Sequence, residues 1–300
     1  MLRLAIDIGG TKIAIGLIDA QYRLLATQKI SVATAGEPIT VIAEAVLALC
    51  QRVGVAQTEI VSCGVGVPGT VSADGRTLIK APNLALITHD FVANLEQALG
   101  VPVTLMQDSR AAAWGEYLAG GGKGASALVC ITLGTGIGTG IVLDGKIWHG
   151  ALGNAGELGH LPVMEGGRIC GCGKSGCLEK YAAGGGLDIT ARALLGEDAT
   201  AHDLFCVAEQ GNSTALQVLD EAVVMLGRAL VAIVNLLSPD SILFSGGLSA
   251  QKKLYVDPLI AYVRTHCYAI DKLPRMEIAA LGEFSPLVGA ALAPLAYQNS

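Results

Sequence analysis

The sequence predicts a mixed α/β protein with two similar lobes. Three observations support this. Strand-like and helix-like segments alternate along the chain, a strand–glycine turn–strand pattern occurs once near each lobe's expected start, and 52% of the 300 residues are hydrophobic. A chain of this length and composition can bury a large core, and alternating elements are typical of layered α/β architectures. The composition also excludes a disordered chain, which would lack the apolar surface needed to offset the entropy of ordering.

Elements of the first half follow from the spacing of apolar residues. Short apolar runs bounded by turn residues predict strands at 4–8, 13–18, 24–30, 61–67 and 103–106. Apolar residues at helical spacing predict helices at 38–53, 91–99 and 109–118. These segments form the first expected lobe, at 1–118.

The run Gly120–Gly124 is the expected lobe boundary, because its glycines cannot sustain a helix or strand. The second expected lobe spans 119–285, and a final helix within 286–300 is expected to pack back on the first lobe. Apolar patterning predicts a strand at 241–244 and helices at 187–195, 215–237, 254–263 and 286–297.

The pattern of the first hairpin returns after this boundary. Aligning Leu4–Asp19 with Val129–Asp144, at a constant offset of 125, pairs hydrophobic with hydrophobic, glycine with glycine and aspartate with aspartate. The identities are few, and hairpins also resemble one another by chance. If the pattern is a duplication, two similar lobes present two glycine turns to one interlobe cleft.

Charge and hydropathy exclude two classes of partner. The net charge of −6 and the absence of a basic run argue against nucleic acid. The uncharged stretch Gly124–Leu143 is rich in glycine and threonine, a composition for strands and turns rather than for a membrane helix. The N-terminus shows no secretory signal pattern, so we expect a cytoplasmic protein.

Three glycine turns suggest a nucleotide site. Asp7 ends a strand and is followed by Gly9, Gly10, Thr11 and Lys12, which offer backbone N–H groups, a hydroxyl and an ammonium to a phosphate, with Asp7 facing a metal ion. An ordinary hairpin turn also accepts two glycines. A second turn, with Gly134, Thr135 and Gly136, and a third, with Gly246 and Gly247, favour the nucleotide.

One further glycine pattern is rejected. Gly64–Gly69 fits the dinucleotide fingerprint, but Pro68 and the residues that follow do not open a helix.

A metal site is the strongest single signal. His160, Cys170, Cys172 and Cys177 supply one imidazole and three thiolates within eighteen residues, and glycines between them let the chain wrap closely. This is a complete tetrahedral zinc set without an open position, so the metal is expected to be structural. The five other cysteines are interpreted as small buried hydrophobic residues.

Three carboxylates are candidates for the chemistry. Glu157 and Glu179 flank the zinc loop at 160–177 and either accept hydrogen bonds from a polyhydroxyl ligand or are solvated surface acids. Asp108 follows a strand and starts a helix. It is interpreted as an N-cap, as a general base toward an alcohol, or as both.

Together these motifs resemble the ROK family of bacterial sugar kinases, within the actin-like (ribonuclease H-like) ATPase fold. The resemblance spans nearly all of the chain. It rests on the run from Asp7 to Lys12, on Leu133–Gly138, on Gly156–His160 and on the cysteine-rich run Cys170–Glu179.

The resemblance implies an ATP-dependent hexose 6-kinase that uses Mg²⁺. It places Gly10, Thr11, Lys12, Thr135 and Gly136 around the phosphates, with Gly246 and Gly247 near the adenosine. It implies a sugar held by Asn83, Asp108, Glu157, His160 and Glu179, with Asp108 taking the proton from the primary hydroxyl. The acceptor stays open among glucose, allose, allulose, fructose and N-acetylated amino sugars.

The sequence departs from the family pattern at three points. Gln107 replaces the usual Asn before the catalytic Asp, Ser245 replaces a glycine in the adenosine turn, and Leu161–Met164 is closer to allose-type kinases. Family members also include sugar-responsive regulators with an N-terminal helix-turn-helix, for which we expect no room ahead of Leu4. A homodimer or homotetramer is expected.

Overall fold

The computed structural model describes residues 1–10, 12–31, 38–80, 90–268 and 272–297. Thr11 and Asn83, both expected in the site, lie outside these residues. The chain forms two compact units. The first contains Met1–Gly124, Gly140–Ala155 and Phe284–Ser300, and the second contains Ala125–Thr139 and Gly156–Glu283.

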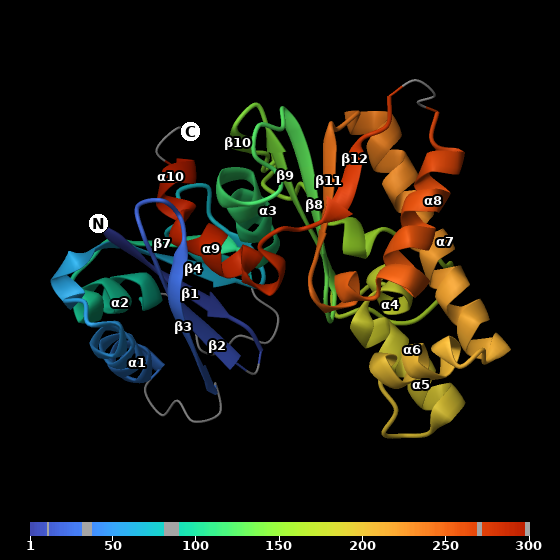
Figure 1. Cartoon of the computed structure of the whole chain (residues 1–300), viewed down its shortest axis with the longest axis horizontal. Helices are drawn as coiled ribbons and strands as arrows, with labels where there is room; N and C mark the ends of the chain where they lie inside the picture. The colour runs from blue at the N-terminus through green and yellow to red at the C-terminus, as the bar shows by residue number, and fades with distance from the viewer. Residues whose placement is uncertain (11, 32–37, 81–89, 269–271, 298–300) are drawn as a thin grey trace. The chain divides into compact units, whose positions relative to one another are not determined.

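The first sheet has the strand order β3-β2-β1-β4-β7 (Figure 1). Its strands are β1 (Leu2–Ile8), β2 (Lys12–Ile18), β3 (Leu24–Ser31), β4 (Ile60–Val67) and β7 (Val103–Gln107). β1, β2 and β3 are antiparallel neighbours, whereas β1, β4 and β7 run parallel. The carboxyl ends of these three parallel strands therefore meet at one edge of the sheet.

The second sheet repeats this arrangement, with the order β10-β9-β8-β11-β12. Its strands are β8 (Ala127–Leu133), β9 (Ile137–Leu143), β10 (Lys146–Ile147), β11 (Ser241–Ser245) and β12 (Arg275–Ile278). β8, β11 and β12 are parallel, and β9 and β10 are antiparallel. β8 and β9 have the bounds of β1 and β2 displaced by 125 residues, so the repeat expected from the sequence is present in the strands.

Helices cover both faces of the first sheet. They are α1 (Pro38–Val53), α2 (Phe91–Leu99), α3 (Asp108–Ala119), α9 (Ser285–Ala291) and α10 (Ala293–Tyr297). Leu4 and Ile6 of β1 share a buried cluster with apolar residues of α1 and α2, whereas Ala5 packs with Leu287 and Ala291 of α9. Successive strand residues point to opposite faces, so β1 contributes to both layers.

Small residues let α9 approach closely. A Cβ atom on Gly64 of β4 would overlap the carbonyl of Ala290, and one on Gly289 would overlap the carbonyl of Ala111 in α3. Gly64 belongs to the rejected dinucleotide pattern, and the structure supplies a packing reason for it.

The second unit is covered by α4 (Glu179–Ala182), α5 (Gly184–Leu195), α6 (Ala201–Glu209), α7 (Ser213–Leu237) and α8 (Asp257–His266). Between the regular elements lie the single turns Gln57–Glu59, Leu158–His160, Gly247–Ala250 and Gly282–Phe284, and a π-helical turn at Lys252–Val256. Asn212 caps α7, its Oδ1 accepting from the Ala215 N–H at 3.0 Å. That cap satisfies one of the donors that every helix start leaves without an intrahelical partner.

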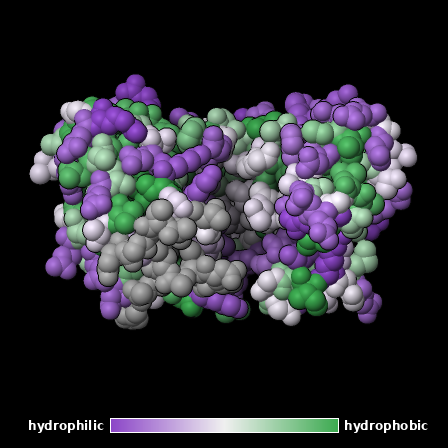
Figure 2. Space-filling view, turned by 90° about the horizontal axis from the view of Figure 1, so that it is seen from below, coloured by the Kyte–Doolittle hydropathy of each residue, from purple (hydrophilic) through white to green (hydrophobic). Residues whose placement is uncertain are grey.

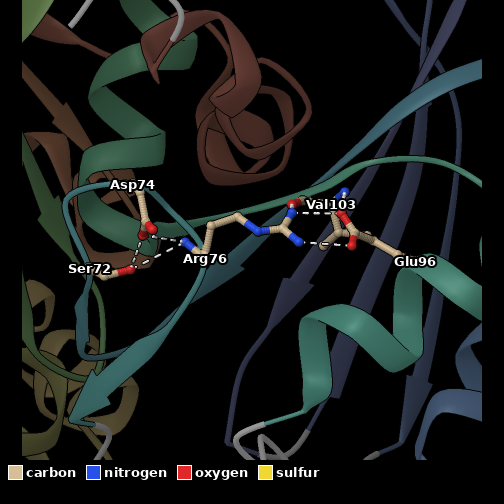
Figure 3. Close-up of polar contacts among 5 residues, drawn as sticks. All are labelled: Ser72, Asp74, Arg76, Glu96 and Val103. Atoms are coloured by element: carbon tan, nitrogen blue, oxygen red, sulfur yellow. Dashed lines mark hydrogen bonds and ion pairs between the residues drawn. The ribbon is translucent and has the colours of Figure 1, made fainter.

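A small hairpin of the first unit, β5 (Thr70–Val71) and β6 (Leu78–Lys80), is tied down by Arg76. The guanidinium of Arg76 donates to both carboxylate oxygens of Glu96 in α2, at 2.6 and 2.8 Å, and to the carbonyl of Val103 at 2.7 Å (Figure 3). Asp74 and Ser72 close the turn beside it. This bidentate pair holds the pKa of Glu96 below its ordinary value of 4.5.

Most elements expected from the sequence are present, and β5, β6, β10, β12 and α4 occur in addition to them. The last helix is not continuous over 286–297 but is divided at Leu292, because Pro294 lacks the N–H that would continue the hydrogen-bond ladder. Helix α6 was not expected. Its start carries a signal in the sequence, since Thr200 and Asp203 cap each other reciprocally.

On the face drawn in Figure 2, hydrophobic residues form small groups among hydrophilic ones. Among the residues that the structure describes, no helix combines the length and the apolar character needed to cross a bilayer.

Candidate active site

The carboxyl edge of the first sheet brings two acids together. Asp7 lies beside Gly66 of β4 in the register, and Gly66 in turn lies beside Met106 of β7. Burial, with a smaller contribution from the negative charge of Asp108, raises the pKa of Asp7 from 3.8 to about 7. Two carboxylates 101 positions apart in the chain therefore interact at this edge.

Gly66 provides space for Asp7. A Cβ atom at Gly66 would lie 2.9 Å from the Oδ1 of Asp7, tighter than ordinary contacts allow. Sequence reasoning set this glycine aside with the rejected dinucleotide pattern. Its role appears only when β1 and β4 are paired.

Asp108 is the first residue of α3, and Gln107 is the residue at the N-cap position. The Oδ1 of Asp108 accepts a hydrogen bond from the Ser109 N–H at 2.6 Å. The interpretation of Asp108 as the N-cap is therefore wrong, because Gln107 holds that position. The carboxylate of Asp108 accepts from an N–H of the helix's own first turn and stands at the carboxyl end of β7. Gln107 makes no side-chain cap to the helix.

The turn between β1 and β2 is closed by a hydrogen bond from the Gly9 N–H to the Lys12 carbonyl, at 2.9 Å. Gly10 is exposed, and an added Cβ there would meet nothing within 4 Å. The Lys12 side chain is exposed at the start of β2. Gly10 and the Lys12 side chain are therefore accessible to an anion.

The corresponding turn of the second sheet lies against a helix start. The N–H groups of Gly184 and Gly185, at the start of α5, donate to the carbonyls of Gly134 and Thr135 at 2.8 and 3.0 Å. A Cβ atom on either of these two α5 glycines would lie 2.9 Å from the same carbonyl oxygens. The glycine run 184–186 was missed in the sequence, where three consecutive glycines signal such a close approach.

The third turn joins the second at the same sheet edge. Ser245 pairs with Thr132 in the parallel register of β11 and β8. Gly246 has a φ of +88°, and an added Cβ would lie 2.6 Å from the Leu133 carbonyl oxygen. The second and third turns are therefore neighbours within one unit.

The cysteine–histidine cluster is assembled as expected. One donor atom from each of His160, Cys170, Cys172 and Cys177 lies within 4.8 Å of the others. The Cys170 Sγ is 3.6 Å from the His160 Nδ1, and the Cys172 and Cys177 Sγ atoms are 3.6 Å apart. Ligands about 2.3 Å from a tetrahedral zinc ion lie roughly 3.8 Å from one another, so the donor set fits zinc in kind and in spacing.

Burial and hydrogen bonds shift the pKa values of these three thiols. It raises the pKa of Cys170 to about 12 and also raises that of Cys177, whereas the Lys174 N–H lowers that of Cys172. Thiols bind zinc as thiolates, so metal binding displaces protons from this cluster. His160 and the cysteines would hold the ion, and its chemistry there is structural because the donor set is complete.

Two carboxylates border the cluster. The Cys170 S–H donates to the Glu179 Oε1 at 3.0 Å, and the His160 Nε2 lies 3.8 Å from the Glu157 Oε2. Zinc held through the Nδ1 of His160 would leave its Nε2 directed toward Glu157. The structure therefore brings Glu157, His160 and Glu179 together, as the sequence suggested.

Glu179 also reaches the glycine turn. An added Cβ on Gly136 would lie 2.9 Å from the Glu179 Oε2. Glu179 therefore lies between the cysteine–histidine cluster and the second turn. A side chain at position 136 would displace the Glu179 carboxylate, and glycine avoids this.

The predicted site residues are divided between the two units. Asp7, Gly9, Gly10, Lys12 and Asp108 belong to the first, and the second holds the remaining described ones, namely Gly134, Thr135, Gly136, Glu157, His160, Cys170, Cys172, Cys177, Glu179, Gly246 and Gly247.

Comparisons with known proteins show which family the chain is similar to. The chain matches the model of the ROK family over residues 3–296. It is 35% identical to a glucokinase of Streptomyces coelicolor, over 97% of this chain and 96% of that protein. It is 35% identical to an N-acetylmannosamine kinase of Salmonella arizonae, over 88% of each chain.

A solved structure extends the similarity to the fold. The ROK family glucokinase of Streptomyces griseus, in complex with glucose and AMPPNP, superimposes with a TM-score of 0.82 at 33% identity. The match covers 99% of this chain and 100% of that one.

Proposed function

Because this chain belongs to the ROK family and is a sugar kinase, we propose that it transfers the γ-phosphoryl group of ATP to the primary 6-hydroxyl of a hexose, with Asp108 as the general base. The observation that carries the proposal is the pair of carboxylates at the carboxyl edge of the first sheet. An acid at this edge can accept the hydroxyl proton, and its neighbour can face a cation.

The role of Asp108 follows from its position. As the sugar oxygen attacks the γ-phosphorus, the carboxylate takes the hydroxyl proton and the phosphorus–oxygen bond to ADP breaks. Its anchored hydrogen bond to Ser109 holds one oxygen in place. In-line phosphoryl transfer needs mostly positioning and charge neutralisation, so one base and several backbone donors suffice on the protein side.

A magnesium ion suits the acidic edge. Asp7 and Asp108 repel each other, and a divalent cation relieves that repulsion while matching their oxygen donors. Asp7 is the residue that would face it. When bound with ATP, the ion neutralises charge that develops on the phosphates during transfer.

The glycine turns would hold the nucleotide. We propose that the phosphates contact Gly9, Gly10, Thr11, Lys12, Gly134, Thr135 and Gly136 and that the adenosine lies near Gly246 and Gly247. The open space around Gly10 and the adjacency of the second and third turns support this assignment.

The sugar would be bound by Asn83, Asp108, Glu157, His160 and Glu179. Carboxylates accept hydrogen bonds from hydroxyls, and buried polar groups left unpaired penalise analogues that lack one. Glucose is the first acceptor to test, since the S. griseus relative was solved with glucose.

The experiment is a coupled ADP-release screen. Purified protein with Mg-ATP is offered aldohexoses, ketohexoses and N-acetylhexosamines, and the product is identified by the position of its phosphate. Phosphorylation of N-acetylmannosamine but not of glucose would shift the acceptor to the amino sugars, for which the Salmonella relative is named. Hexose binding without ADP release would instead support a sugar-responsive sensor and contradict the kinase proposal.

A further inference from the structure

Arg110 is a buried cation inside the first unit. It lies on α3, two residues after Asp108, and only 3% of its surface is exposed. A guanidinium removed from water is costly unless its donors are satisfied. Its contacts therefore indicate what the residue is positioned to hold.

Three contacts of its Nη atoms reach one segment. The Nη1 of Arg110 is 3.0 Å from the Nδ1 of His149, and its Nη2 donates to the carbonyls of Gly153 and Ala155, at 2.6 and 3.2 Å. These three residues belong to the irregular segment 148–155, which follows β10. One side chain thus ties the helix that starts at Asp108 to a loop about forty residues further along the chain.

The donor pattern defines the state of His149. Because a guanidinium can only donate, the Nδ1 of His149 accepts and its proton is on Nε2. Burial, together with the positive charge of Arg110, lowers the pKa of His149 and so favours this neutral form. The His149 ring also stacks on Tyr297 of α10, with 6.2 Å between centroids.

The held segment leads directly to Glu157. The Ala155 carbonyl is bound by Arg110, and Gly156 follows with a φ of +91°. An added Cβ on Gly156 would overlap the carbonyl of Thr139, so β9 fixes the chain on this side. The backbone just before Glu157 is thus restrained at two successive residues, and Arg110 supplies the first restraint.

We propose that Arg110 is a positioning residue for hexose binding, which holds segment 148–155 and thereby orients Glu157. The inference rests on the proposed function, because it assigns Glu157 to the sugar. Arg110 does not touch substrate in this role. Its effect is expected on the affinity for the sugar rather than on that for the nucleotide.

The test compares two substitutions at Arg110 with a stability control. Arg110→Gln removes the charge and most of the donors. Arg110→Lys keeps the charge, but a single ammonium cannot replace the fork that reaches His149 and both carbonyls. Leu49→Ala, in the apolar core beneath α1, destabilises the same unit without touching the segment.

Steady-state kinetics with the hexose and ATP varied separately gives the readout. Both Arg110 variants are expected to raise the KM for the hexose about tenfold, with the KM for ATP changed less than about twofold. Leu49→Ala is expected to lower Tm while leaving both KM values unchanged. If Arg110→Gln does not fold, the KM for the hexose of Arg110→Lys tests the inference.

Three results would overturn the inference. A folded Arg110 variant with the wild-type KM for the hexose contradicts it while leaving the kinase proposal intact. An equal rise in the two KM values, or the same rise in Leu49→Ala, shows a general loss of structure instead. A wild-type protein that releases no ADP with any hexose contradicts the proposed function, and this inference falls with it.

Discussion

The two hairpins that open the two sheets share one backbone plan and differ in what surrounds them. Both consist of two seven-residue strands joined by three residues. At the position where the first has Asp7, the second has Thr132. The first edge holds two interacting acids, whereas the turn at the second edge lies against backbone glycines and beside the Glu179 carboxylate.

The comparison shows that the repeated hairpin provides a glycine turn in each sheet. The residues that differ between the units provide the acids and the metal ligands. In the first unit β7 leads directly into α3, so that Asp108 stands near Asp7. In the second unit, the chain before α4 carries the cysteine–histidine cluster, and Glu179 is the first residue of α4. Variants in the two units can therefore separate catalysis, stability and sugar binding.

The largest effect is expected from Asp108→Asn, which tests whether the acidic edge performs the proton transfer. Loss of a general base should lower kcat by about 10² to 10⁴, with a small change in the KM for the hexose. Stopped-time assays of ADP release measure this change. Asp220→Asn, an exposed position on α7, is the matched control, and full activity of Asp108→Asn would refute the assigned role.

The next effect concerns the cysteine–histidine cluster of the second unit. Cys172→Ser should reduce the zinc content from roughly one ion per chain to none. If the wild-type protein is at a thousandfold excess of zinc over its Kd, the lost binding is worth about 4 kcal/mol and roughly 10 °C in Tm.

Metal analysis and thermal melts together decide this prediction. Cys206→Ser, on α6 and outside the cluster, should retain both the metal and the Tm. Wild-type protein that holds no zinc after purification in zinc-containing medium would contradict the assignment.

A third test compares Asp7 with its counterpart Thr132. Since the pKa of Asp7 is about 7 in the folded protein and near 3.8 when unfolded, the folded state keeps a proton that the unfolded chain releases between these values. The free energy of unfolding therefore falls as pH rises through that window. Asp7→Asn should remove this fall and raise stability by roughly 1–3 kcal/mol at about pH 8, while impairing activity.

Thermal melts without nucleotide or divalent cation, from about pH 4 to pH 8, measure the effect. Thr132→Val should change stability by no more than about 0.5 kcal/mol and show no new pH dependence. The same pH dependence of stability in wild type and Asp7→Asn would contradict the raised pKa of Asp7.

The smallest effect distinguishes two glycines of one turn. Gly136→Ala places a methyl group against the Glu179 carboxylate, so the KM for the hexose should rise about three- to tenfold as that side chain shifts. Gly134→Ala adds a methyl group that meets nothing within 4 Å and should not alter the KM for the hexose. The same KM for the hexose in both variants would contradict the assignment of Glu179 to sugar binding.

Much of this protein could be predicted without its tertiary structure. The strands of both hairpins, helices α1, α2 and α3, and the zinc ligands depend on local periodicity or on spacings of a few residues. Local signals survive in one sequence because neighbours in the chain are also neighbours in space. Helix α6 is an exception, because apolar spacing did not predict it although its capping pair, Thr200 and Asp203, is visible in the sequence.

Local patterns therefore identify the components: two glycine-turn hairpins, a histidine with three cysteines, and acids after strands. The folded structure adds that burial and the neighbouring Asp108 raise the pKa of Asp7, that Gly66 makes room for Asp7, and that Arg110 holds the segment before Glu157. These facts depend on which strands pair and which helices pack. Such contacts join residues tens of positions apart, and their energies depend on burial that no local pattern records.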